Sequence, residues 1–511
     1  MFARLKSSLP YITVVVLALL IMRPLLNSTW YPMHDTTHIA RTYLLEQTLH
    51  SGQIPALWAS GVNNGYGYPL FQFYAPLVYY LTLAVKMLVG SYIVALKIIL
   101  FALLVTAGSS AAYLTRRWGS WAATVAAASY MLLPYAAVNI YVRGAFAEYA
   151  AMALLPWVFA TWEHLRSGSD VRNAVVVGSL FILSHNLIPI MAAPFLTVWA
   201  IGGNRKRMSK LLFAGAITLL ITAWYWVNLV FERSFVQVDT VALRSDFHLH
   251  FVYLSQLWNS VWGYGGSAPG PIDGMSFKIG KVQVLATAGA AVLAIFRRSK
   301  RAAFFVGLSA FAAYMTTSYS QIVWDHVPFL PMVQFPWRFL TLVGLGVAVS
   351  SGAVVALLPR SVKGIVAILT IGSCFWFGYK YFVPQTTFAG SDSAYTSPAY
   401  LATVANIVPE YMPRWMPETP PQAAGSIPKT VTGPGWISLP RAYYPTWFAS
   451  LDNAQVTLAP DSSGLIALYV PTGSHTLTLW QGHTTLEWVG LAVSAVTLIW
   501  LYAWWEDSEY V

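Results

Sequence analysis

The sequence has little charge and almost no cysteine. Only 10% of its 511 residues are Asp, Glu, Lys or Arg, while 57% are hydrophobic. A soluble domain carries about 25% charged residues, so this chain lacks the polar surface needed to face water on all sides. Its one cysteine, Cys374, excludes disulfides and a cysteine-based metal site within the chain. These deficits predict an integral membrane protein.

What the chain has instead is a series of apolar runs of about the length that crosses a ~30 Å hydrocarbon core. It also has 22 Trp, 29 Tyr and 26 Phe, and such rings collect at the two membrane interfaces. The formal charge of +11 comes from short basic clusters between apolar runs. That pattern is typical of cytoplasmic loops and anionic lipid contacts, and it argues against nucleic-acid binding.

The first apolar run, residues 11–22, follows Arg4 and Lys6 and lacks a small-residue cleavage pattern after it. We predict an uncleaved first helix that starts in the cytoplasm and delivers a polar loop, residues 27–69, to the outer face. That loop contains a predicted helix at residues 36–51.

For the next two apolar runs, residues 70–89 and 92–114, apolar length predicts two full crossings, but the positive-inside rule argues against them. If both crossed fully, Arg116 and Arg117 would lie outside, against the positive-inside rule. We therefore predict that residues 70–89 are re-entrant or interfacial, which is tolerable only where protein buries them.

The remaining apolar runs bring the prediction to about 12 transmembrane helices with a second outer loop at residues 231–278. The predicted spans are residues 121–140, 147–162, 175–201 as a short hairpin, 211–230, 282–296, 302–315, 339–358 and 365–382. The basic clusters at residues 205–207, 297–301 and 360–363 then all fall inside. Residues 1–382 thus form one transmembrane domain.

Residues 383–485 are richer in Pro, Ser, Thr and Gly. Stretches at 454–458, 465–470 and 475–480 carry strand-forming residues, and turn signals at 460–464 and 471–473 separate them. We predict a small β-rich extracytoplasmic domain here. Residues 486–511 then form a last transmembrane helix with an acidic cytoplasmic tail.

Charged residues near membrane depth are costly, so each is a functional candidate. The predicted topology places a small set of them on the outer face: Asp35, His38, Arg143, Glu148, His185, Glu232 and Arg338. Together they suit a reaction on an anionic lipid head group. Arginine holds a phosphate through paired hydrogen bonds, while a carboxylate removes a proton or holds a metal.

Each candidate also has a structural interpretation. Asp35 could cap the helix that follows it, and His38 could lie on a solvated helix end rather than in a metal site. Arg143 and Glu148 could neutralise each other at a hairpin tip. His185 could be a hydrogen-bonded structural histidine, and Arg338 could be an interfacial anchor.

Several motifs resemble a known family. They are Asp35-x-x-His38, the stretches at residues 52–58 and 65–76, Tyr141-Val-Arg143-Gly-Ala-Phe-Ala-Glu148, Ser184-His185-Asn186, Ala223-Trp-Tyr-Trp226 with Glu232, and Gln334-Phe-Pro-Trp-Arg338. This set resembles the large prokaryotic membrane proteins described as 6-pyruvoyl-tetrahydropterin synthase-related. The tail, with residues 443–447 and 471–475, resembles the outer β-domain of YfhO-type proteins.

Both groups resemble glycosyltransferases of the GT-C superfamily, and that resemblance implies a fold and a role for Asp35. In that superfamily an acidic residue just after the first helix serves as base or metal ligand, and Asp35 matches its position. The donor is typically a sugar on a polyprenyl phosphate. One departure concerns the metal: many such enzymes have paired acids there, whereas Asp35 is flanked by His34 and Thr36. A divalent ion, Mg²⁺ or Mn²⁺, is expected only with that reservation.

Our leading hypothesis is a glycosyltransferase at the outer face of a prokaryotic plasma membrane, which transfers a sugar from a polyprenyl phosphate to an envelope glycan, lipid or protein. The resemblance implies catalytic roles, with Asp35 as possible metal ligand, and substrate contacts. The catalytic candidates are Asp35, His38, Glu148 and His185; the substrate-binding candidates are Arg143, Arg338, Glu232, Tyr68 and Tyr74.

Two other functions remain open. A lipid-linked glycan carrier or flippase would use the same charges along a path, and prolines interrupt several spans as in broken transporter helices. A non-catalytic protein of envelope assembly would use the charges only for structure. Likewise, the aromatic residues at 66–80 could wall a polyprenyl groove or simply pack between helices.

Overall fold

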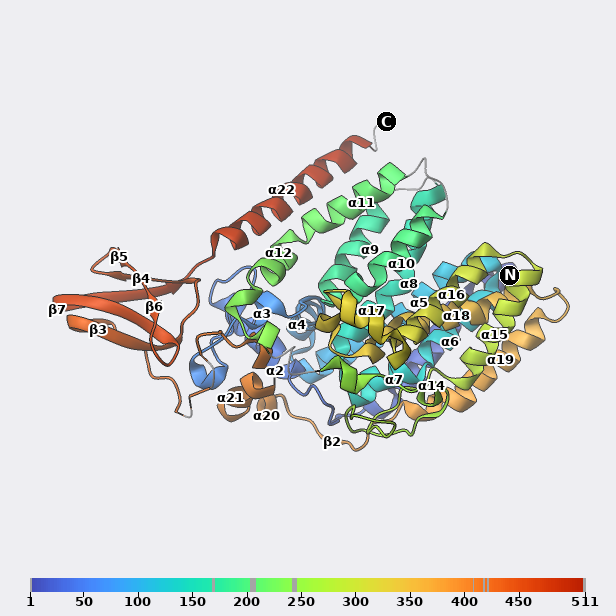
Figure 1. Cartoon of the computed structure of the whole chain (residues 1–511), viewed down its shortest axis with the longest axis horizontal. Helices are drawn as coiled ribbons and strands as arrows, with labels where there is room; N and C mark the ends of the chain where they lie inside the picture. Colours follow the sequence, from blue (N-terminus) through green and yellow to red (C-terminus); the bar gives the residue numbers. More distant parts are fainter. Residues whose placement is uncertain are drawn as a thin grey trace. The chain divides into compact units, whose positions relative to one another are not determined.

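The computed structural model describes residues 2–167, 171–202, 208–240, 246–407, 409–416, 419–420 and 422–508. Most of the described chain is helical (Figure 1). Its elements separate into two compact units, each made of three stretches of chain. Unit 1 comprises Met1–Thr36, Val85–Ala216 and Ser245–Gly390, and unit 2 comprises Thr37–Ala84, Ile217–Arg244 and Ser391–Val511. The boundaries predicted from composition, at residues 382 and 485, divide the chain sequentially and stay a prediction.

Unit 1 is a helical bundle whose longer helices match the predicted apolar runs. They are α1 (Phe2–Met22), α5 (Tyr92–Thr115), α6 (Ser120–Met131), α8 (Phe146–Ser167), α9 (Val171–Ser184), α10 (Ile188–Ile201), α15 (Lys281–Phe296), α16 (Lys300–Met315), α18 (Leu340–Leu357) and α19 (Lys363–Gly378). Shorter elements are α7 (Pro134–Ala137), α14 (Leu254–Asn259), α17 (Gln321–His326), and the pair β1 (Thr29–Trp30) and β2 (Phe388–Ala389). Helices α4 (Leu77–Val89) and α11 (Met208–Ile221) each contribute to both units.

Helix α18 lies at the centre of unit 1, packed against α6, α15 and α16. Nearly all of its side chains are buried. Its contact with α16 depends on Gly346, where a Cβ atom would lie 2.6 Å from the Cβ of Ser309 and 2.8 Å from the backbone oxygen of Phe305. The two backbones approach this closely because residue 346 has no side chain.

Four helical segments of the described chain are long and apolar enough to cross a membrane, and two bent pairs could each add one more. The four are Ser7–Leu25, Tyr92–Trp118, Pro336–Leu357 and Thr485–Trp504. The bent pairs are Ser120–Met131 with Pro134–Val142, at 45°, and Met208–Ile221 with Ala223–Phe231, at 76°. Other apolar helices are shorter, so the number of about 12 crossings stays a prediction.

Residues 70–89 form two short helices, α3 (Leu70–Phe73) and α4. At 1.5 Å per residue, the 13 residues of α4 extend about 20 Å, which is less than the ~30 Å hydrocarbon core. Helices α9 and α10 have 14 residues each and are of similar length, so the re-entrant or interfacial position of residues 70–89 stays a prediction. The basic cluster at residues 205–207 and Glu509 of the acidic tail, both used in the topology prediction, lie outside the described residues.

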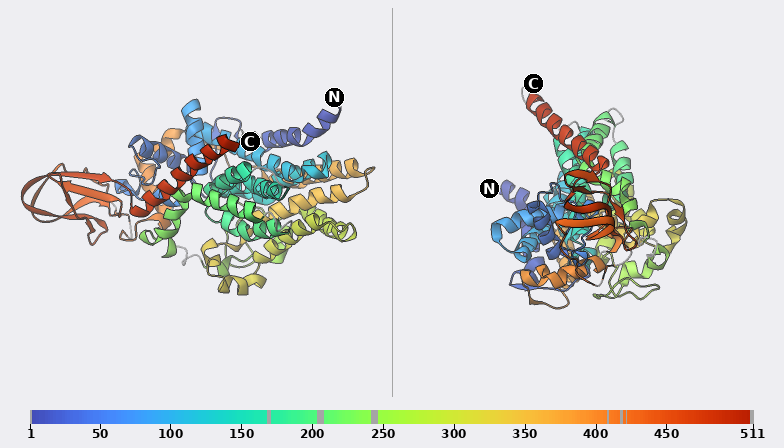
Figure 2. Two further views of the ribbon diagram at one scale, coloured as in Figure 1. Left: turned by 90° about the horizontal axis from the view of Figure 1, so that it is seen from above. Right: turned by 90° about the vertical axis from the view of Figure 1, so that its left-hand side faces the viewer.

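Unit 2 combines the predicted first-loop helix with the C-terminal part of the chain. Its remaining helices are α2 (His38–His50), α12 (Ala223–Phe231), α20 (Asp392–Thr396), α21 (Pro398–Ile407) and α22 (Thr485–Ser508). Helices α12 and α22 lie side by side (Figure 2). A buried core joins the first-loop residues to the C-terminal stretch, and it includes Trp58, Tyr68, Tyr411 and Tyr444.

The predicted β-rich region is a five-stranded antiparallel sheet with the order β3-β7-β4-β5 and β6 paired to β7 (Figure 1). Its strands are β3 (Thr430–Ala442), β4 (Trp447–Leu451), β5 (Ala454–Val456), β6 (Ala459–Pro460) and β7 (Leu465–Gln481). The turn predicted at 460–464 is confirmed, since Gly464 N–H donates to the Asp461 carbonyl. The turn predicted at 471–473 is wrong. Strand β7 continues through it, with a register shift where Gly433 faces both Thr472 and Gly473.

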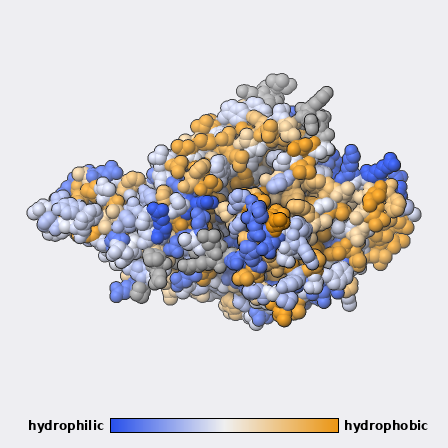
Figure 3. Space-filling view, in the orientation of Figure 1, coloured by the Kyte–Doolittle hydropathy of each residue, from blue (hydrophilic) through white to orange (hydrophobic). Residues whose placement is uncertain are grey.

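Hydrophobic side chains gather over the helices on the face seen in Figure 3, whereas the β-sheet is mostly hydrophilic. Large apolar side chains such as Leu212, Trp376 and Ile499 are more than 60% exposed. Exposure of this kind would be unfavourable in water and is expected for helix faces in contact with lipid. The described chain is therefore organised as a membrane protein.

We predict that Gly346→Ala lowers the melting temperature of the purified protein, because the added methyl group meets backbone atoms of α16. Overpacking of this kind costs about 1–3 kcal/mol. Gly307→Ala on α16 is the matched control. No atom lies within 4 Å of a Cβ at 307, and alanine is the better helix former, so this change should be neutral or slightly stabilising. Equal effects of both changes would contradict the close packing.

Candidate functional site

The tip of one helical hairpin in unit 1 carries two of the predicted residues, Arg143 and Glu148. Helix α7 begins at Pro134 and runs into a π-helix, Val138–Val142. Gly144 then turns the chain with a φ of +64°, a conformation that glycine adopts without strain. Helix α8 begins at Phe146, so Glu148 lies in its first turn. π-Helical segments of this kind are frequent at functional sites.

Arg143 and Glu148 form a buried ion pair, with 2.8 Å between Nη1 of the arginine and Oε2 of the carboxylate. The same Nη1 donates to Oδ1 of Asn139 at 2.6 Å and to the hydroxyl of Tyr135 at 3.2 Å. The guanidinium also lies 4.4 Å from the ring centroid of Trp337. The two side chains therefore make the contact that the structural interpretation requires, in which Arg143 and Glu148 neutralise each other.

The other oxygen of Glu148 is also occupied. Tyr135 donates its hydroxyl proton to Oε1 at 2.5 Å, and Thr341 of α18 donates at 3.2 Å. With three hydrogen-bonding contacts and 1% exposure, this carboxylate is held rigidly. It is better arranged to fix Arg143 than to exchange a proton with a substrate.

Arg338 and His185 complete this charged group, since both interact electrostatically with Glu148. Arg338 belongs to a short 3-10 helix before α18, and its Nη1 donates to the Val333 carbonyl at 2.6 Å. Gln334, with a φ of +65°, folds its side-chain oxygen to within 3.3 Å of the same nitrogen. The structure thus brings together four candidate residues from three separate sequence motifs.

His185 lies in the turn between α9 and α10, as predicted, and its Nδ1 accepts the backbone N–H groups of Leu187 and Ile188 at 3.0 and 3.2 Å. An Nδ1 that accepts leaves the proton of a neutral ring on Nε2. His185 can therefore donate a hydrogen bond through Nε2 while it caps α10. This geometry favours the structural interpretation and a donor role over that of a general base.

Asp35 lies beside the hairpin tip. Its backbone N–H donates to the Arg143 carbonyl at 2.9 Å, and the N–H of His34 donates to the Val142 carbonyl at 3.0 Å. The N-cap of α2 is Thr37, so Asp35 is not the cap of that helix. The first-loop acid and the buried Arg143–Glu148 pair are thus neighbours in one unit.

Metal binding by Asp35 was predicted with reservation. Among the described residues, no three His, Cys, Asp or Glu side chains gather closely enough to hold a metal ion. The imidazole Nε2 of His34 is 3.0 Å from the Tyr264 carbonyl. Asp35 would therefore be the main protein ligand, and a divalent ion there would need oxygens from a bound phosphate, as Mg²⁺ commonly does.

His38 belongs to unit 2, where it shares Tyr79 as a partner with Arg41, a residue that the sequence did not single out. Its Nδ1 lies 3.0 Å from the hydroxyl of Tyr79, and Nη1 of Arg41 donates to that hydroxyl at 2.9 Å. The Arg41 guanidinium lies 4.0 Å from the ring centroid of Tyr74. Arg41 is 2% exposed, and its position three residues after His38 on one helix face was the signal available in the sequence.

Glu232, at the end of α12, is the acid of a second buried network in unit 2. It accepts hydrogen bonds from Gln72 of α3 and from Thr484 before α22. Gln72 in turn accepts the hydroxyl proton of Tyr444 at 2.9 Å. Burial raises the pKa of Glu232 to about 7, and the two hydrogen bonds oppose that increase.

The remaining predicted residue, Tyr68, is fully buried in the core of unit 2. Its backbone pairs with Ala59 through two hydrogen bonds of 3.0 and 3.2 Å. Tyr74 is partly exposed and packs on Arg41, as described above. Packing explains Tyr68, whereas Tyr74 is the better placed of the two to meet a ligand.

Comparisons with known proteins give one family match. A family model described as a 6-pyruvoyl-tetrahydropterin synthase related domain of membrane proteins matches residues 71–379. A comparison with curated proteins found no match.

Among solved structures, the matches include arabinofuranosyltransferase AftD from Mycobacteria, at 15% identity and a TM-score of 0.49. That alignment covers 75% of this chain and 27% of the other. A mutant of the same enzyme matches at 13% identity and a TM-score of 0.48, covering 75% and 28%. The present chain thus spans about a quarter of the length of these proteins.

We predict that Glu148→Gln destabilises the protein by about 3–5 kcal/mol, because it leaves the buried guanidinium of Arg143 without its counter-charge. The double variant Arg143→Met, Glu148→Gln should lose less than the sum of the two single losses. Melting temperatures of the four proteins in one detergent give this coupling. Additive losses would show that the two charges do not stabilise each other.

We also predict a carboxyl group that titrates near pH 7. In the folded chain Glu232 keeps its proton to about pH 7, whereas an ordinary glutamate loses it near 4.5. As the pH rises through that window the unfolded state loses the proton first, so stability falls with rising pH. The infrared band of the protonated carboxyl should disappear near pH 7 in the wild type and be missing in Glu232→Gln. Glu46→Gln, on α2, is the control; a band that persists in Glu232→Gln would refute the assignment.

Proposed function

The chain belongs to the 6-pyruvoyl-tetrahydropterin synthase related family of membrane proteins, and we propose that it is a membrane glycosyltransferase. It would transfer a sugar from a polyprenyl-phosphate donor to an envelope glycan, lipid or protein. The observation that carries this proposal is the position of Asp35, whose backbone is hydrogen-bonded to that of Arg143. Two residues that are neighbours along their backbones would thus supply the acid and the arginine that this reaction needs.

In the proposed reaction Asp35 is the general base. Its carboxylate takes the proton of the acceptor hydroxyl as the acceptor oxygen bonds to the anomeric carbon of the sugar. The bond between that carbon and the phosphate oxygen breaks, and its electron pair leaves with the polyprenyl phosphate. The negative charge that develops on the leaving phosphate requires cationic partners in the protein.

Arg143 and Arg338 are the proposed partners of that phosphate. Their two positive charges exceed the single negative charge of Glu148, with which both interact. A doubly charged phosphate monoester would therefore be attracted to this group. We assign Glu148 as a positioning residue that fixes the Arg143 guanidinium, and His185 as a hydrogen-bond donor through Nε2.

The roles proposed for unit 2 follow from its own contacts. Tyr74, which is partly exposed, would contact the lipid-linked sugar, and the buried Arg41 and His38 beneath it would support its ring. Glu232, whose pKa burial raises to about 7, would be only partly ionised near neutral pH and contribute a polar contact. The β-sheet would contribute to acceptor binding. In this proposal the first loop and the sheet face the outside of the plasma membrane.

A divalent ion, Mg²⁺ or Mn²⁺, remains part of the proposal only as a companion of the donor phosphate. Asp35 would hold it, and the ion would supply charge neutralisation at the phosphate. Apart from this ion, side chains of the protein such as Arg143 and Arg338 would bind and orient the donor.

The carrier function has one observation in its favour. Two helix pairs are bent by 45° and 76° at breaks within otherwise apolar segments, and broken helices are typical of transporters. A carrier would move a lipid-linked glycan between leaflets without hydrolysis or transfer. The two proposals therefore differ in whether the bond between sugar and phosphate is broken.

We predict that membranes containing the protein transfer radiolabelled sugar from at least one member of a panel of polyprenyl-phosphate sugars. Asp35→Asn should reduce this transfer by about 10²–10⁴-fold, the usual contribution of a general base. Asp239→Asn, an exposed acid with an arginine neighbour, is the control and should retain activity. Expression and melting temperature must match in all three proteins.

Equal transfer by the wild type and Asp35→Asn would remove Asp35 from the reaction. If no donor supports transfer but a labelled lipid-linked glycan changes leaflets in vesicles with the protein, the carrier function is correct instead.

A further inference from the structure

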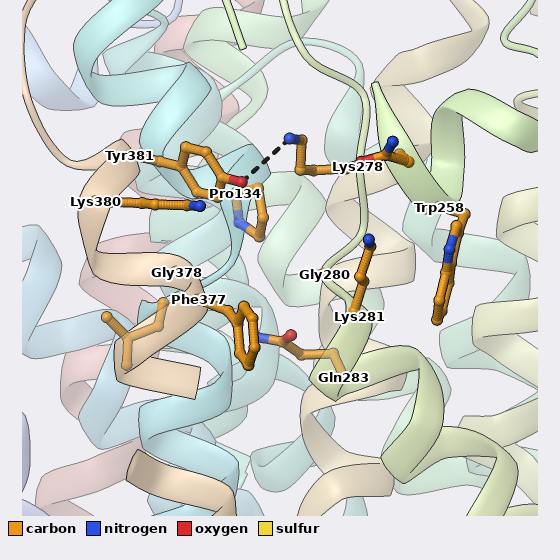
Figure 4. A pocket seen from close by; sticks show the side chains of 12 residues that line it. Pro134, Trp258, Lys278, Gly280, Lys281, Gln283, Phe377, Gly378, Lys380 and Tyr381 are labelled. Carbon is orange, nitrogen blue, oxygen red and sulfur yellow. Dashed lines mark hydrogen bonds between the residues drawn. The ribbon is translucent and has the colours of Figure 1, made fainter. Parts of the chain in front are cut away.

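Unit 1 contains a pocket of about 200 Å³ that none of the roles above uses. It lies between the C-terminal end of α19 and the segment that leads into α15 (Figure 4). Three lysines line it: Lys278, Lys281 and Lys380. Figure 4 shows the amino groups of Lys278 and Lys380 directed toward the space between these two elements, with Lys281 beside it at the start of α15.

Aromatic rings hold the three lysines in place. Lys278 donates to the hydroxyl of Tyr381 at 3.1 Å and lies 4.7 Å from the centroid of that ring. Lys380 lies 5.3 Å from the same ring, and Lys281 lies 5.4 Å from the ring of Trp258. Rings orient a lysine by cation–π attraction but leave its positive charge uncompensated.

Within the described residues, no carboxylate pairs with these charges. The lining of the pocket contains neither Asp nor Glu, and in the described part of the chain none of the three lysines has a carboxylate within 4 Å. The pocket therefore holds three positive charges in a small volume. Lys281 and Lys380 are exposed and Lys278 is half-buried, so water screens their mutual repulsion, while an anion bound in the pocket would be attracted by all three charges.

Helix α15 adds a further attraction for an anion. It begins at Lys281, and Gly280 occupies its N-cap without a side-chain hydrogen bond to the first turn. The backbone N–H groups at the start of this 16-residue helix carry partial positive charge. Gly280 and Lys281 both line the pocket, so this end of the helix supports the lysines.

The surroundings of the pocket indicate where the anion comes from. Trp376 and Phe377 at the end of α19 are 78% and 52% exposed, and Leu285 in the second turn of α15 is 63% exposed. These apolar side chains lie on α15 and α19, next to the chain segments that carry the lysines. A ligand with a charged head and an apolar tail matches this combination, because the head meets the pocket while the tail covers the helices.

Charge placement along the two helices supports a membrane position for the pocket. Helix α15 runs from the pocket to Arg297 and Arg298 at its other end. Helix α19 starts at Lys363, near Arg360, and ends at the pocket. Basic residues thus lie at both ends of each helix, although positive residues usually favour one side of a membrane. The lysines of the pocket therefore lie at the helix ends opposite the basic clusters that are predicted to be cytoplasmic.

We propose that this pocket binds the phosphate group of an anionic phospholipid. Lys278, Lys281 and Lys380 contact the phosphate, and the exposed apolar faces of α15 and α19 contact the acyl chains. The site is independent of the proposed sugar transfer and would anchor the lipid whether or not the protein is an enzyme.

The test uses the full-length protein in a mild detergent and counts bound lipids by native mass spectrometry. The probes are phosphatidylglycerol, zwitterionic phosphatidylcholine with the same acyl chains, and inorganic phosphate. The pocket variant is Lys278→Gln, Lys281→Gln, Lys380→Gln. A control variant with the same change in net charge is Lys210→Gln, Lys300→Gln, Lys363→Gln. Melting temperatures establish that both variants are folded.

The expected result is tight binding of one phosphatidylglycerol to the wild type and to the control variant, at least about 10-fold tighter than phosphatidylcholine. The pocket variant should lose at least about 10-fold in affinity, which corresponds to about 1.4 kcal/mol. Equal binding by all three proteins overturns the proposal. Binding of inorganic phosphate that depends on the pocket lysines, without competition by phosphatidylglycerol, overturns the assignment to a lipid.

Discussion

The low polarity of a membrane protein's interior constrains this structure more than any other factor, and the Arg143–Glu148 pair shows how the constraint is met. An isolated charge in such surroundings costs several kcal/mol, so each must have a partner of opposite sign or several hydrogen bonds. Glu148 forms an ion pair with Arg143 and accepts hydrogen bonds from Tyr135 and Thr341. These partners come from α7, the hairpin tip and α18. One ion pair therefore fixes three separate elements of unit 1.

Unit 2 meets the same constraint by another route. Glu232 is also buried, but among the described residues its partners are neutral: the amide of Gln72 and the hydroxyl of Thr484. Because neither of these partners carries a charge to offset its burial, the protonated form of Glu232 is favoured, and its pKa rises to about 7. The two acids differ in consequence. Glu148 remains an anion that orients a cation, whereas Glu232 changes its charge within the physiological range.

The sequence predicted those features that depend on local pattern. Apolar runs gave the helices of unit 1, and the loop helix at residues 36–51 corresponds to α2. Strand-forming residues at 454–480 indicated a sheet. The turn at 471–473 was wrong because Pro-Thr-Gly can also form a bulge, and the choice depends on the partner strand β3.

Contacts between distant residues could not be predicted. Nothing near Asp35 in the sequence indicates that its backbone pairs with residue 143. The role of Arg41 depends on Tyr74 and Tyr79, which lie more than 30 residues away. The lysine pocket likewise joins residues 278–281 with residue 380. Residue type suggests a function, but only the fold decides which side chains share a site.

Unit 2 is built from three separate stretches of the chain, and this has a consequence for its biosynthesis. Gln72 and Tyr444, which share a hydrogen bond, are 372 residues apart in the chain. At about 5–20 residues per second, a ribosome needs about 20–70 s to synthesise that interval. During this time α2 and α3 have left the ribosome without the strands and helix that complete their core. In the nascent chain, the residues of α2 and α3 that later form the core of unit 2 therefore remain exposed. Folding of unit 2 then depends on interactions that protect these segments until the C-terminal segments have been synthesised.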